Sequence, residues 1–479
     1  MNRRMIGYLL GVILLIEALF MIFPSAVALI YSESVLPFVI TIGLIALISL
    51  PLVLLKPQNT QIYAKEGFIT VALGWIVMSA FGALPFTLSG AIPNYIDAVF
   101  EAISGFTTTG ATILSEIESL PKGILFWRSL THWLGGMGVL VFMLAILPSA
   151  GGQTMHLMRA EVPGPTKGKL VPKMRLSSLI LYGIYVTLTA IQVAVLLLFK
   201  MPLYDSLVTA FGTAGTGGFS VLNNSIAGYN SPAIEWVVAI FMLLFGINFN
   251  IYFFILMGKV KDVLKSEELR TYLLICAVTT VVITANIAST FNNLSDAFRA
   301  SFFQVTSIIS TSGFSTVDFN LWPSLSKTLL ILIMITGACA GSTAGGLKLS
   351  RVMILFKNAV KEIRHIRRPR SVNVIKLDGE AVPADTVRSA TGYLTVYLAV
   401  FIASVILISI DGFSFESNFS SVLTTINNVG PGFDALGPMS NFSVYSYFSK
   451  IVLSLDMLIG RLEILPMMIL FSSIFGKRK

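Results

Sequence analysis

Charged residues are scarce in this chain of 479 residues: Asp, Glu, Lys and Arg make up 12% of it, whereas hydrophobic residues make up 55%. Soluble domains carry about 25% charged residues, so this balance argues against a globular cytosolic protein. The low charge, together with an aromatic content of 11%, also excludes a disordered chain. The expected class is therefore a membrane protein.

Residues typical of metal and disulfide chemistry are few as well. The two cysteines, Cys276 and Cys339, lie in apolar stretches, where an isolated cysteine is usually a small buried hydrophobe. The histidines His132, His156 and His365 show no metal-ligand spacing. The sequence also has no phosphate-binding Walker loop and no paired catalytic carboxylates. We therefore expect no enzyme activity and no organic cofactor on this chain.

Apolar runs long enough to cross a hydrocarbon core of ~30 Å recur along the whole sequence. They contain Leu, Ile, Phe and Ala without alternation, which predicts helices rather than barrel strands. The ten predicted spans are Ile6–Ile30, Val35–Leu55, Gly67–Leu88, Ile124–Leu147, Ser178–Phe199, Trp236–Met257, Tyr272–Ile287, Thr328–Leu347, Thr391–Ile410 and Ile451–Phe475. The predicted fold class is an all-α polytopic membrane protein.

Lysine and arginine are unevenly shared between alternate connections. If ten spans are correct, most of the 33 basic residues fall on one side, including Lys348–Lys376 and the C-terminal Lys477–Lys479. By the positive-inside rule both termini are then cytoplasmic. The net charge of +9 follows from this topology, so nucleic acid is not needed as a partner. The run Arg364–Arg370 has two interpretations: contact with solvent or lipid headgroups, which composition favours, or docking of a cytosolic partner.

Four connections on the opposite side share one pattern, a short apolar stretch that ends in small and hydroxylated residues around a glycine. The stretches begin at Phe100, Val208, Phe303 and Ser420. A gapless alignment places glycine at the eleventh position of each: Gly110, Gly218, Gly313 and Gly430. Ordinary turns are also rich in Gly, Ser and Thr, but four at matched positions between spans predict an internal fourfold repeat.

Such loops have a specific chemical use. Non-helical backbone at membrane depth is tolerated only where protein buries it or water lines it. Four converging loops would present carbonyl oxygens that replace the hydration shell of a cation, and the carbonyl ends of the preceding half-helices would favour positive charge. The predicted filter residues are Thr108, Thr109, Gly110, Thr216, Gly217, Gly218, Thr311, Ser312, Gly313, Asn428, Val429 and Gly430.

These four segments resemble the filter loops of the Trk/Ktr/HKT superfamily of potassium transporters, and most closely its TrkH-type pore subunits. Further matches are Trp133–Gly138, Ala160–Pro165, Gly246–Phe249, Gly337–Gly346 and Gly460–Ile464. The resemblance covers nearly the whole chain. Two spans precede the first repeat, which favours the TrkH type over the shorter Ktr type.

The resemblance implies four covalently linked, non-identical helix–pore loop–helix repeats around one pore, after two extra N-terminal transmembrane helices. The expected boundaries are residues 1–60 for the extra helices and 61–155, 156–262, 263–375 and 376–479 for the repeats. It also implies potassium ions at the filter residues, a homodimer in membrane lipid, and a cytosolic nucleotide-binding regulatory subunit of the TrkA type.

The eighth predicted span contains a glycine-rich stretch that has two interpretations. Glycines spaced every four residues are typical of a helix-packing face, but Gly345-Gly346 weakens a helix in mid-membrane. The resemblance favours a gating loop within the membrane, beneath the filter. The predicted gate residues are Gly337, Gly341, Ser342, Thr343, Gly345, Gly346 and Arg461.

Arg461 lies inside the tenth predicted span, where a charge is disfavoured by ~2.5–3.5 kcal/mol and should face protein or water. It either pairs with Glu463, snorkels to the interface, or, as the resemblance implies, places a fixed positive charge at the pore constriction. We assign Arg128 and His132, near the outer end of the fourth span, no role beyond interfacial anchoring.

The predicted function is potassium uptake across the bacterial inner membrane through this filter, gated by the intramembrane loop and the cytosolic partner. The alternative is a proton- or sodium-coupled secondary potassium symporter, in which broken helices bind substrate at mid-membrane. Fourfold rather than twofold repetition argues against that alternative.

Overall fold

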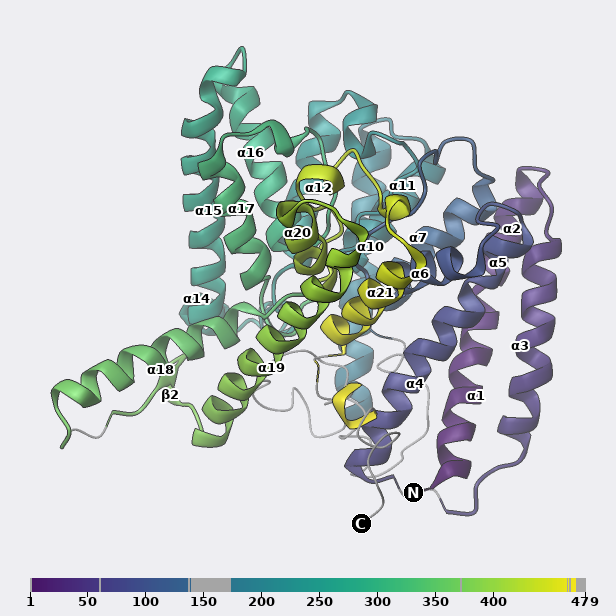
Figure 1. The fold of residues 1–479 in the computed structure, drawn as a ribbon, viewed down its shortest axis with the longest axis horizontal. Helices are drawn as coiled ribbons and strands as arrows, with labels where there is room; N and C mark the ends of the chain where they lie inside the picture. Colours follow the sequence, from purple (N-terminus) through teal and green to yellow (C-terminus); the bar gives the residue numbers. More distant parts are fainter. Residues whose placement is uncertain are drawn as a thin grey trace.

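The computed structural model describes residues 2–59, 62–136, 138, 174–370, 373–462, 464 and 467–470. Within these ranges the chain is mainly helical, and the single sheet is a short antiparallel hairpin of β1 (Lys376–Leu377) and β2 (Glu380–Ala381). The predicted helical class is thus confirmed for the described part of the chain. Figure 1 shows the helices running side by side through the height of the molecule.

The N-terminal helices form one side of the molecule, at the right of Figure 1. α1 (Arg3–Phe20) continues after a break at Met21 as α2 (Ile22–Ile30), and α3 (Leu36–Leu54) returns beside α1. α4 (Ala64–Gly82) packs against α1 and leads into the short α5 (Leu84–Leu88). The first three predicted spans are therefore helices with short interruptions.

Four short helices precede the four glycine-containing stretches that the sequence singles out. They are α6 (Tyr95–Phe106), α11 (Leu203–Gly215), α16 (Leu294–Ile309) and α20 (Phe415–Ile426). Each packs against the helix that follows its loop: α7 (Lys122–Gly136), α12 (Pro232–Phe245), α17 (Ser324–Thr336) and α21 (Tyr447–Arg461), respectively. The first and last of these units also touch, through α21 and α6.

The other helices flank or connect these units. They are α10 (Met174–Leu198), α13 (Phe249–Leu256), α14 (Val260–Lys265), α15 (Glu267–Ile287), α18 (Leu349–Arg367) and α19 (Ala384–Ile408). α18 and its hairpin project sideways from the lower end of the molecule in Figure 1, at the same end as the start of α1.

Six helical stretches in the described residues are long and apolar enough to cross a membrane, and a bent pair adds a seventh. Two of the eight predicted spans that the structure describes throughout are wrong as continuous helices. Trp236–Met257 breaks between α12 and α13 with a 90° bend, and Thr328–Leu347 stops being helical at Thr336. The fourth and tenth predicted spans lie partly outside the described residues.

A glycine lies at each of the two breaks. Gly246, at the first break, approaches α15 so closely that an added Cβ would lie 2.3 Å from the Tyr272 hydroxyl oxygen. Gly337, at the second, has a φ of +64°, a left-handed backbone that other residues rarely adopt. Glycine thus permits a close approach between helices at the first break and a left-handed backbone at the second.

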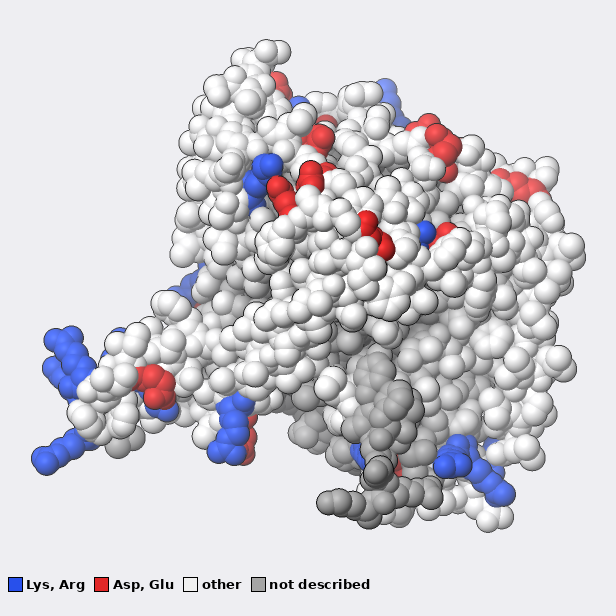
Figure 2. Space-filling model, in the orientation of Figure 1, with Lys and Arg blue, Asp and Glu red and all other residues white. Residues whose placement is uncertain are grey.

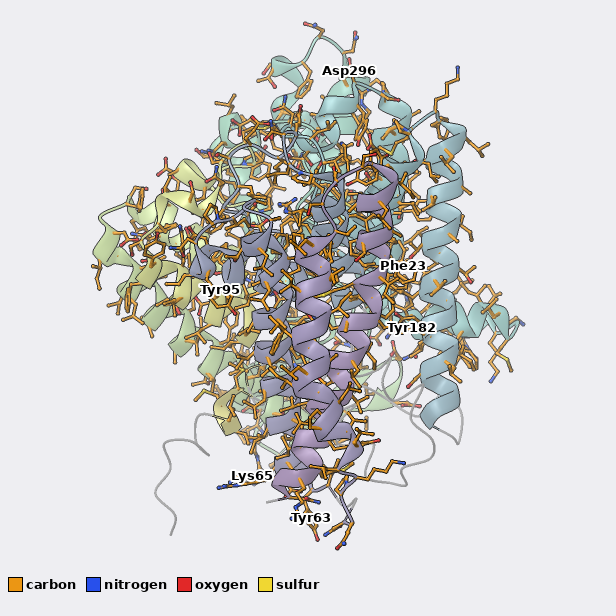
Figure 3. All side chains as sticks on the ribbon, turned by 90° about the vertical axis from the view of Figure 1, so that its right-hand side faces the viewer. Phe23, Tyr63, Lys65, Tyr95, Tyr182 and Asp296 are labelled. Carbon is orange, nitrogen blue, oxygen red and sulfur yellow. The ribbon has the colours of Figure 1, made fainter. Side chains whose placement is uncertain are left out.

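Charge is distributed unevenly between the two ends of the molecule. Figure 2 shows acidic side chains mostly on the upper half of the visible face and basic ones mostly along the lower edge. Figure 3 places Tyr63 and Lys65 at the lower end and Asp296 at the upper end. Basic side chains on the visible face thus gather mostly at the end of the molecule where α1 begins.

Candidate ion-conducting site

The four short helices end in turns of the same geometry, which we call the glycine loops (residues 107–110, 215–218, 310–313 and 427–430). The second residue of each loop is left-handed although it is not glycine: φ is +56° at Thr108, +58° at Thr216, +58° at Thr311 and +54° at Asn428. The closing glycines have φ between +75° and +99°. A non-glycine residue in this region costs conformational free energy, which the surrounding structure must offset. Such residues are found mainly at functional sites.

Hydrogen bonding is the same in the four loops. The residue before each glycine donates its backbone N–H to the carbonyl five residues earlier. These bonds are Thr109 to Ser104 at 2.9 Å, Gly217 to Gly212 at 2.9 Å, Ser312 to Ser307 at 2.8 Å and Val429 to Thr424 at 2.9 Å. The sequence alignment of the four stretches therefore corresponds to four turns of one kind.

The loops contact one another in a closed ring. A Cβ added at Gly110 would lie 1.9 Å from the carbonyl oxygen of Gly217, and one at Gly218 would lie 2.0 Å from that of Ser312. The third loop meets the fourth in the same way, since a Cβ at Gly313 would lie 2.3 Å from the Val429 oxygen. The fourth returns to the first, with 2.7 Å between a Cβ at Gly430 and the Thr109 oxygen.

This ring brings together all twelve predicted filter residues. Glycine is required at the four contact points, because any side chain there would strike the neighbouring loop. The loops also carry hydroxyl and amide groups: Asn428 donates its side-chain N–H to Thr109 Oγ1 at 2.9 Å, and Thr107 and Thr109 share a hydroxyl hydrogen bond of 2.7 Å. The site is thus built from neutral oxygen-bearing groups, which suit a hard monovalent cation.

Arg128 and His132 support this ring from α7, and their assignment to the membrane interface is wrong. Both are buried. The His132 ring contacts the Gly105 carbonyl through Nδ1 at 2.8 Å and packs on Phe219, with 4.0 Å between ring centroids. A Cβ at Gly217 would lie 2.4 Å from His132 Nδ1, so the imidazole fills the space directly behind the second loop.

Arg128 forms a buried ion pair with Glu101 of α6, with 2.7 Å between Nε and Oε1. The guanidinium also donates to the Ser220 carbonyl at 3.2 Å and stacks on Phe219, while Glu101 accepts from the backbone N–H of Ile113 at 3.0 Å. The pair therefore ties the chain after the first glycine loop to the chain after the second. Glu101 and Arg128 are 27 residues apart in the sequence and lie on different helices, so their spacing does not predict the ion pair.

Two helix glycines let the supporting helices approach the loops closely. A Cβ at Gly135 of α7 would lie 1.9 Å from the Phe106 carbonyl oxygen, and one at Gly460 of α21 would lie 2.1 Å from that of Ile426. Phe106 and Ile426 occupy the same place, four residues before the loop glycine. The motifs Trp133–Gly138 and Gly460–Ile464 therefore bring α7 and α21 against equivalent points of the first and fourth loops.

Residues 337–348, which we call the connecting segment, join α17 to α18 without forming a helix. The Gly345 N–H donates to Thr311 Oγ1 in the third glycine loop at 2.7 Å. A Cβ at Gly345 would lie 2.3 Å from the Asn427 carbonyl oxygen, so the segment also touches the fourth loop. The interpretation of this stretch as a helix-packing face is therefore wrong. Of the predicted gate glycines, Gly345 lies directly against the ring, whereas Gly337 and Gly346 face each other and Gly341 faces the Asn248 side chain.

Arg461 joins three parts of this site. Its guanidinium donates to the Thr343 carbonyl of the connecting segment at 2.8 Å and to the Gly136 carbonyl of α7 at 2.9 Å, and it also bonds the Gly135 carbonyl. The side chain is buried, so it does not snorkel to the interface. Glu463, its proposed ion-pair partner, lies outside the described residues, as do His156 and Ala160–Pro165.

Comparison with known proteins agrees with this arrangement. The family model for TrkH, described as a cation transport protein, matches residues 37–477. The chain belongs to the TrkH family of cation transport proteins. It is 36% identical to the Trk system potassium uptake protein TrkH of Salmonella typhimurium over the full length of both chains. It is also 33% identical to the Trk system potassium uptake protein TrkG of Escherichia coli, with 99% of each chain covered.

A solved structure extends the match to three dimensions. The crystal structure of the potassium transporter TrkH from Vibrio parahaemolyticus superposes with a TM-score of 0.88 at 32% sequence identity, and the match covers all of both chains. The resemblance stated from the sequence motifs is thus confirmed at the level of the family.

Proposed function

We propose that this chain is the pore-forming subunit of a potassium uptake system in the bacterial inner membrane, with the ring of glycine loops as its selectivity filter. The closed sequence of contacts from Gly110 through Gly218, Gly313 and Gly430 back to Thr109 carries the proposal. Four loops of one geometry around a common centre would make a single passage with fourfold pseudosymmetry. The relatives named as potassium uptake proteins support potassium as the ion.

The chemistry of the ring accounts for passage of a dehydrated cation. Backbone carbonyl oxygens replace the water shell of potassium, and the C-terminal dipoles of α6, α11, α16 and α20 add negative potential at the loops. Each unit charge that crosses gains ~2.3 kcal/mol per 100 mV of membrane potential, which sustains uptake without hydrolysis in this chain. The four loops have only one matched glycine each. We therefore expect the filter to let rubidium pass and to reject sodium incompletely.

The connecting segment and Arg461 form the gate in this proposal. The segment lies against the third and fourth loops, and Arg461 holds it through the Thr343 carbonyl. A fixed positive charge on the cytoplasmic side of the filter would oppose cation passage until the segment moves. In this proposal the repeats have the boundaries expected from the sequence, residues 61–155, 156–262, 263–375 and 376–479, and both termini are cytoplasmic.

The proposal includes a homodimer with one pore per chain and a cytosolic nucleotide-binding regulatory subunit of the TrkA type. The names of the relatives, which refer to a Trk system, support a multicomponent assembly. Nucleotide effects would then act through the partner, and this chain itself would be a transporter rather than an enzyme.

Rubidium flux into liposomes that contain only this protein, with an inside-negative potential, tests the proposal. Uptake that potassium competes and that falls when the potential collapses is the expected result. Uptake that appears only after the regulatory subunit and nucleotide are added would mean that the pore is closed in the absence of its partner. Stoichiometric movement of protons or sodium with rubidium would instead establish the symporter alternative.

A further inference from the structure

The two ends of the connecting segment are bound to one carboxylate oxygen. Glu268, the second residue of α15, accepts hydrogen bonds at Oε1 from the backbone N–H of Ala340 at 2.7 Å and from that of Ser350 at 3.1 Å. Ala340 lies near the start of the segment and Ser350 just after its end. Glu268 itself is buried, with 8% of its surface exposed.

Several neutral contacts also hold the segment. Phe249 of α13 donates its N–H to the Gly341 carbonyl at 3.0 Å, and Cys339 donates its N–H to the Gly246 carbonyl at 3.1 Å. Bonds in which the acceptor is a carboxylate are roughly twice as strong as bonds between neutral groups. Glu268 makes two such bonds with one side chain, and it joins residues that are ten apart in the sequence.

The turn that carries Glu268 is bound in its own right to the cytoplasmic-side structure around α18. The N–H of the neighbouring Glu267 donates to Asp378 Oδ1 in the hairpin at 2.7 Å. Glu267 also forms an ion pair with Lys357 of α18, and Lys357 Nζ donates to the Lys376 carbonyl at 2.8 Å. Glu267 and Lys357 are partly exposed, so this cluster is reachable from solvent.

We propose that Glu268 is the positioning residue that holds the connecting segment against the glycine loops. It acts by fixing both ends of the segment to the first turn of α15. The Glu267–Lys357–Asp378 cluster links that same turn to α18 and the hairpin, so displacement of these elements would withdraw Glu268 from the segment. The consequence for conduction rests on the proposed function, whereas the fastening itself does not.

Cys339 offers a readout that is independent of transport. Its side chain is fully buried within the connecting segment, and the other cysteine, Cys276, can be removed as Cys276→Ala. In that background the rate of Cys339 labelling by a water-soluble maleimide reports how often the segment leaves its site. Glu268→Ala removes both hydrogen bonds and should raise this rate by about tenfold or more, given the strength of bonds to charged groups.

Conservative and control variants separate positioning from general loosening. Glu268→Gln keeps an acceptor oxygen at the same reach but loses the charge, so its labelling rate should fall between that of Glu268→Ala and that of the parent. Glu362→Ala, which removes a carboxylate from the exposed surface of α18, should leave the rate unchanged. If Glu268→Ala does not purify as a folded protein, Glu268→Asp, which withdraws the oxygen by one methylene, replaces it with the same expected increase.

The proposal is overturned if Cys339 is labelled at the same rate in the parent and in Glu268→Ala. The same holds for Glu268→Asp where it replaces the alanine variant. A matching increase in Glu362→Ala overturns it as well. Rubidium flux in the same preparations tests the pore separately: the alanine variant should conduct more than the parent without any partner. Faster labelling in a protein that conducts nothing would support the positioning role of Glu268 and count against the proposed function.

Discussion

Asn428 of the fourth glycine loop donates its side-chain amide to Thr109 of the first, 2.9 Å away. The two residues are 319 positions apart, and their bond joins the last loop of the ring to the first. The same amide donates to the Met457 carbonyl of α21 at 2.9 Å. One side chain therefore closes the ring and attaches it to its supporting helix.

Asn428→Ala is expected to weaken ion preference. The change removes the hydrogen bonds of the Asn428 amide to Thr109 and Met457, each worth about 0.5–1.5 kcal/mol, at the junction between the first and fourth loops. Relative uptake of rubidium and sodium in liposomes measures the effect. Asn427→Ala is the matched control, because the Asn427 amide donates to the Tyr397 hydroxyl of α19 at 2.9 Å rather than to another loop, and its loss should affect stability without affecting preference. Equal preferences in the two variants would contradict this role of Asn428.

Gly313→Ser should reduce potassium preference. Its Cβ would lie 2.3 Å from the Val429 carbonyl oxygen, and its φ of +77° disfavours any side chain by about 1–2 kcal/mol. The third and fourth loops must then move apart. Gly392→Ser in α19, where no atom lies within 4 Å of an added Cβ, is the control. Relative permeabilities that stay the same in Gly313→Ser would remove the third loop from the filter.

Arg461→Gln is expected to raise rubidium flux in the absence of any partner, by about tenfold, because charge-assisted bonds to three carbonyls are lost. Removal of the positive charge should act in the same direction. Arg461→Lys keeps the charge but cannot reproduce the planar set of donors. Its rubidium flux should therefore lie between that of the parent and that of Arg461→Gln. A flux in Arg461→Gln no greater than in the parent would exclude Arg461 as a barrier.

Arg128→Ala should destabilise the protein by about 3–5 kcal/mol, because it leaves Glu101 buried without its partner. Thermal unfolding in detergent measures the loss. The double variant Glu101→Gln/Arg128→Met removes both charges at once and should be less destabilised than Arg128→Ala alone. If the double variant is instead as unstable as the sum of the two single changes, the residues do not act as a pair.

Asp434, which follows the fourth glycine loop, should make stability depend on acid pH. Hydrogen bonds from the Ser414 hydroxyl and from the Ser417 hydroxyl, the latter at 2.7 Å, lower the pKa of its carboxyl below the usual value. A lowered pKa stabilises the folded state above the ordinary pKa, and this contribution is lost as the pH falls through both values. The thermal midpoint of the parent should therefore fall more between pH 6 and pH 3 than that of Asp434→Asn. Parallel curves for the two proteins would show that this carboxylate does not contribute.

The sequence predicted the glycine loops well because their signal is local. A glycine at a fixed place after a short apolar stretch, found four times, marks a turn that only certain residues can make. The breaks after Phe245 and Thr336 were harder to predict, since apolar residues continue on both sides of them. The contact of Tyr272 with Gly246 comes from another helix, so the local sequence around the first break does not reveal it.

The supporting residues could not be predicted from spacing at all. Glu101 and Arg128 lie on different helices, and Glu268 contacts residues 72 and 82 positions away. A charged residue near the end of an apolar run has the same local pattern whether it faces water, lipid headgroups or a buried partner. The family resemblance pointed to Arg461 as a gate residue, which stays a prediction, whereas the contacts of Glu268 and His132 depend on how the helices assemble.

The ring of loops belongs to one polypeptide, and its four quarters differ in their side chains. Where three loops have threonine at the left-handed position, the fourth has asparagine. A point mutation therefore alters a single quadrant of the ring, whereas in a channel of four identical subunits it would alter every quadrant at once. In the proposed filter, successive point mutations can therefore change ion preference one loop at a time while the other three loops stay unchanged.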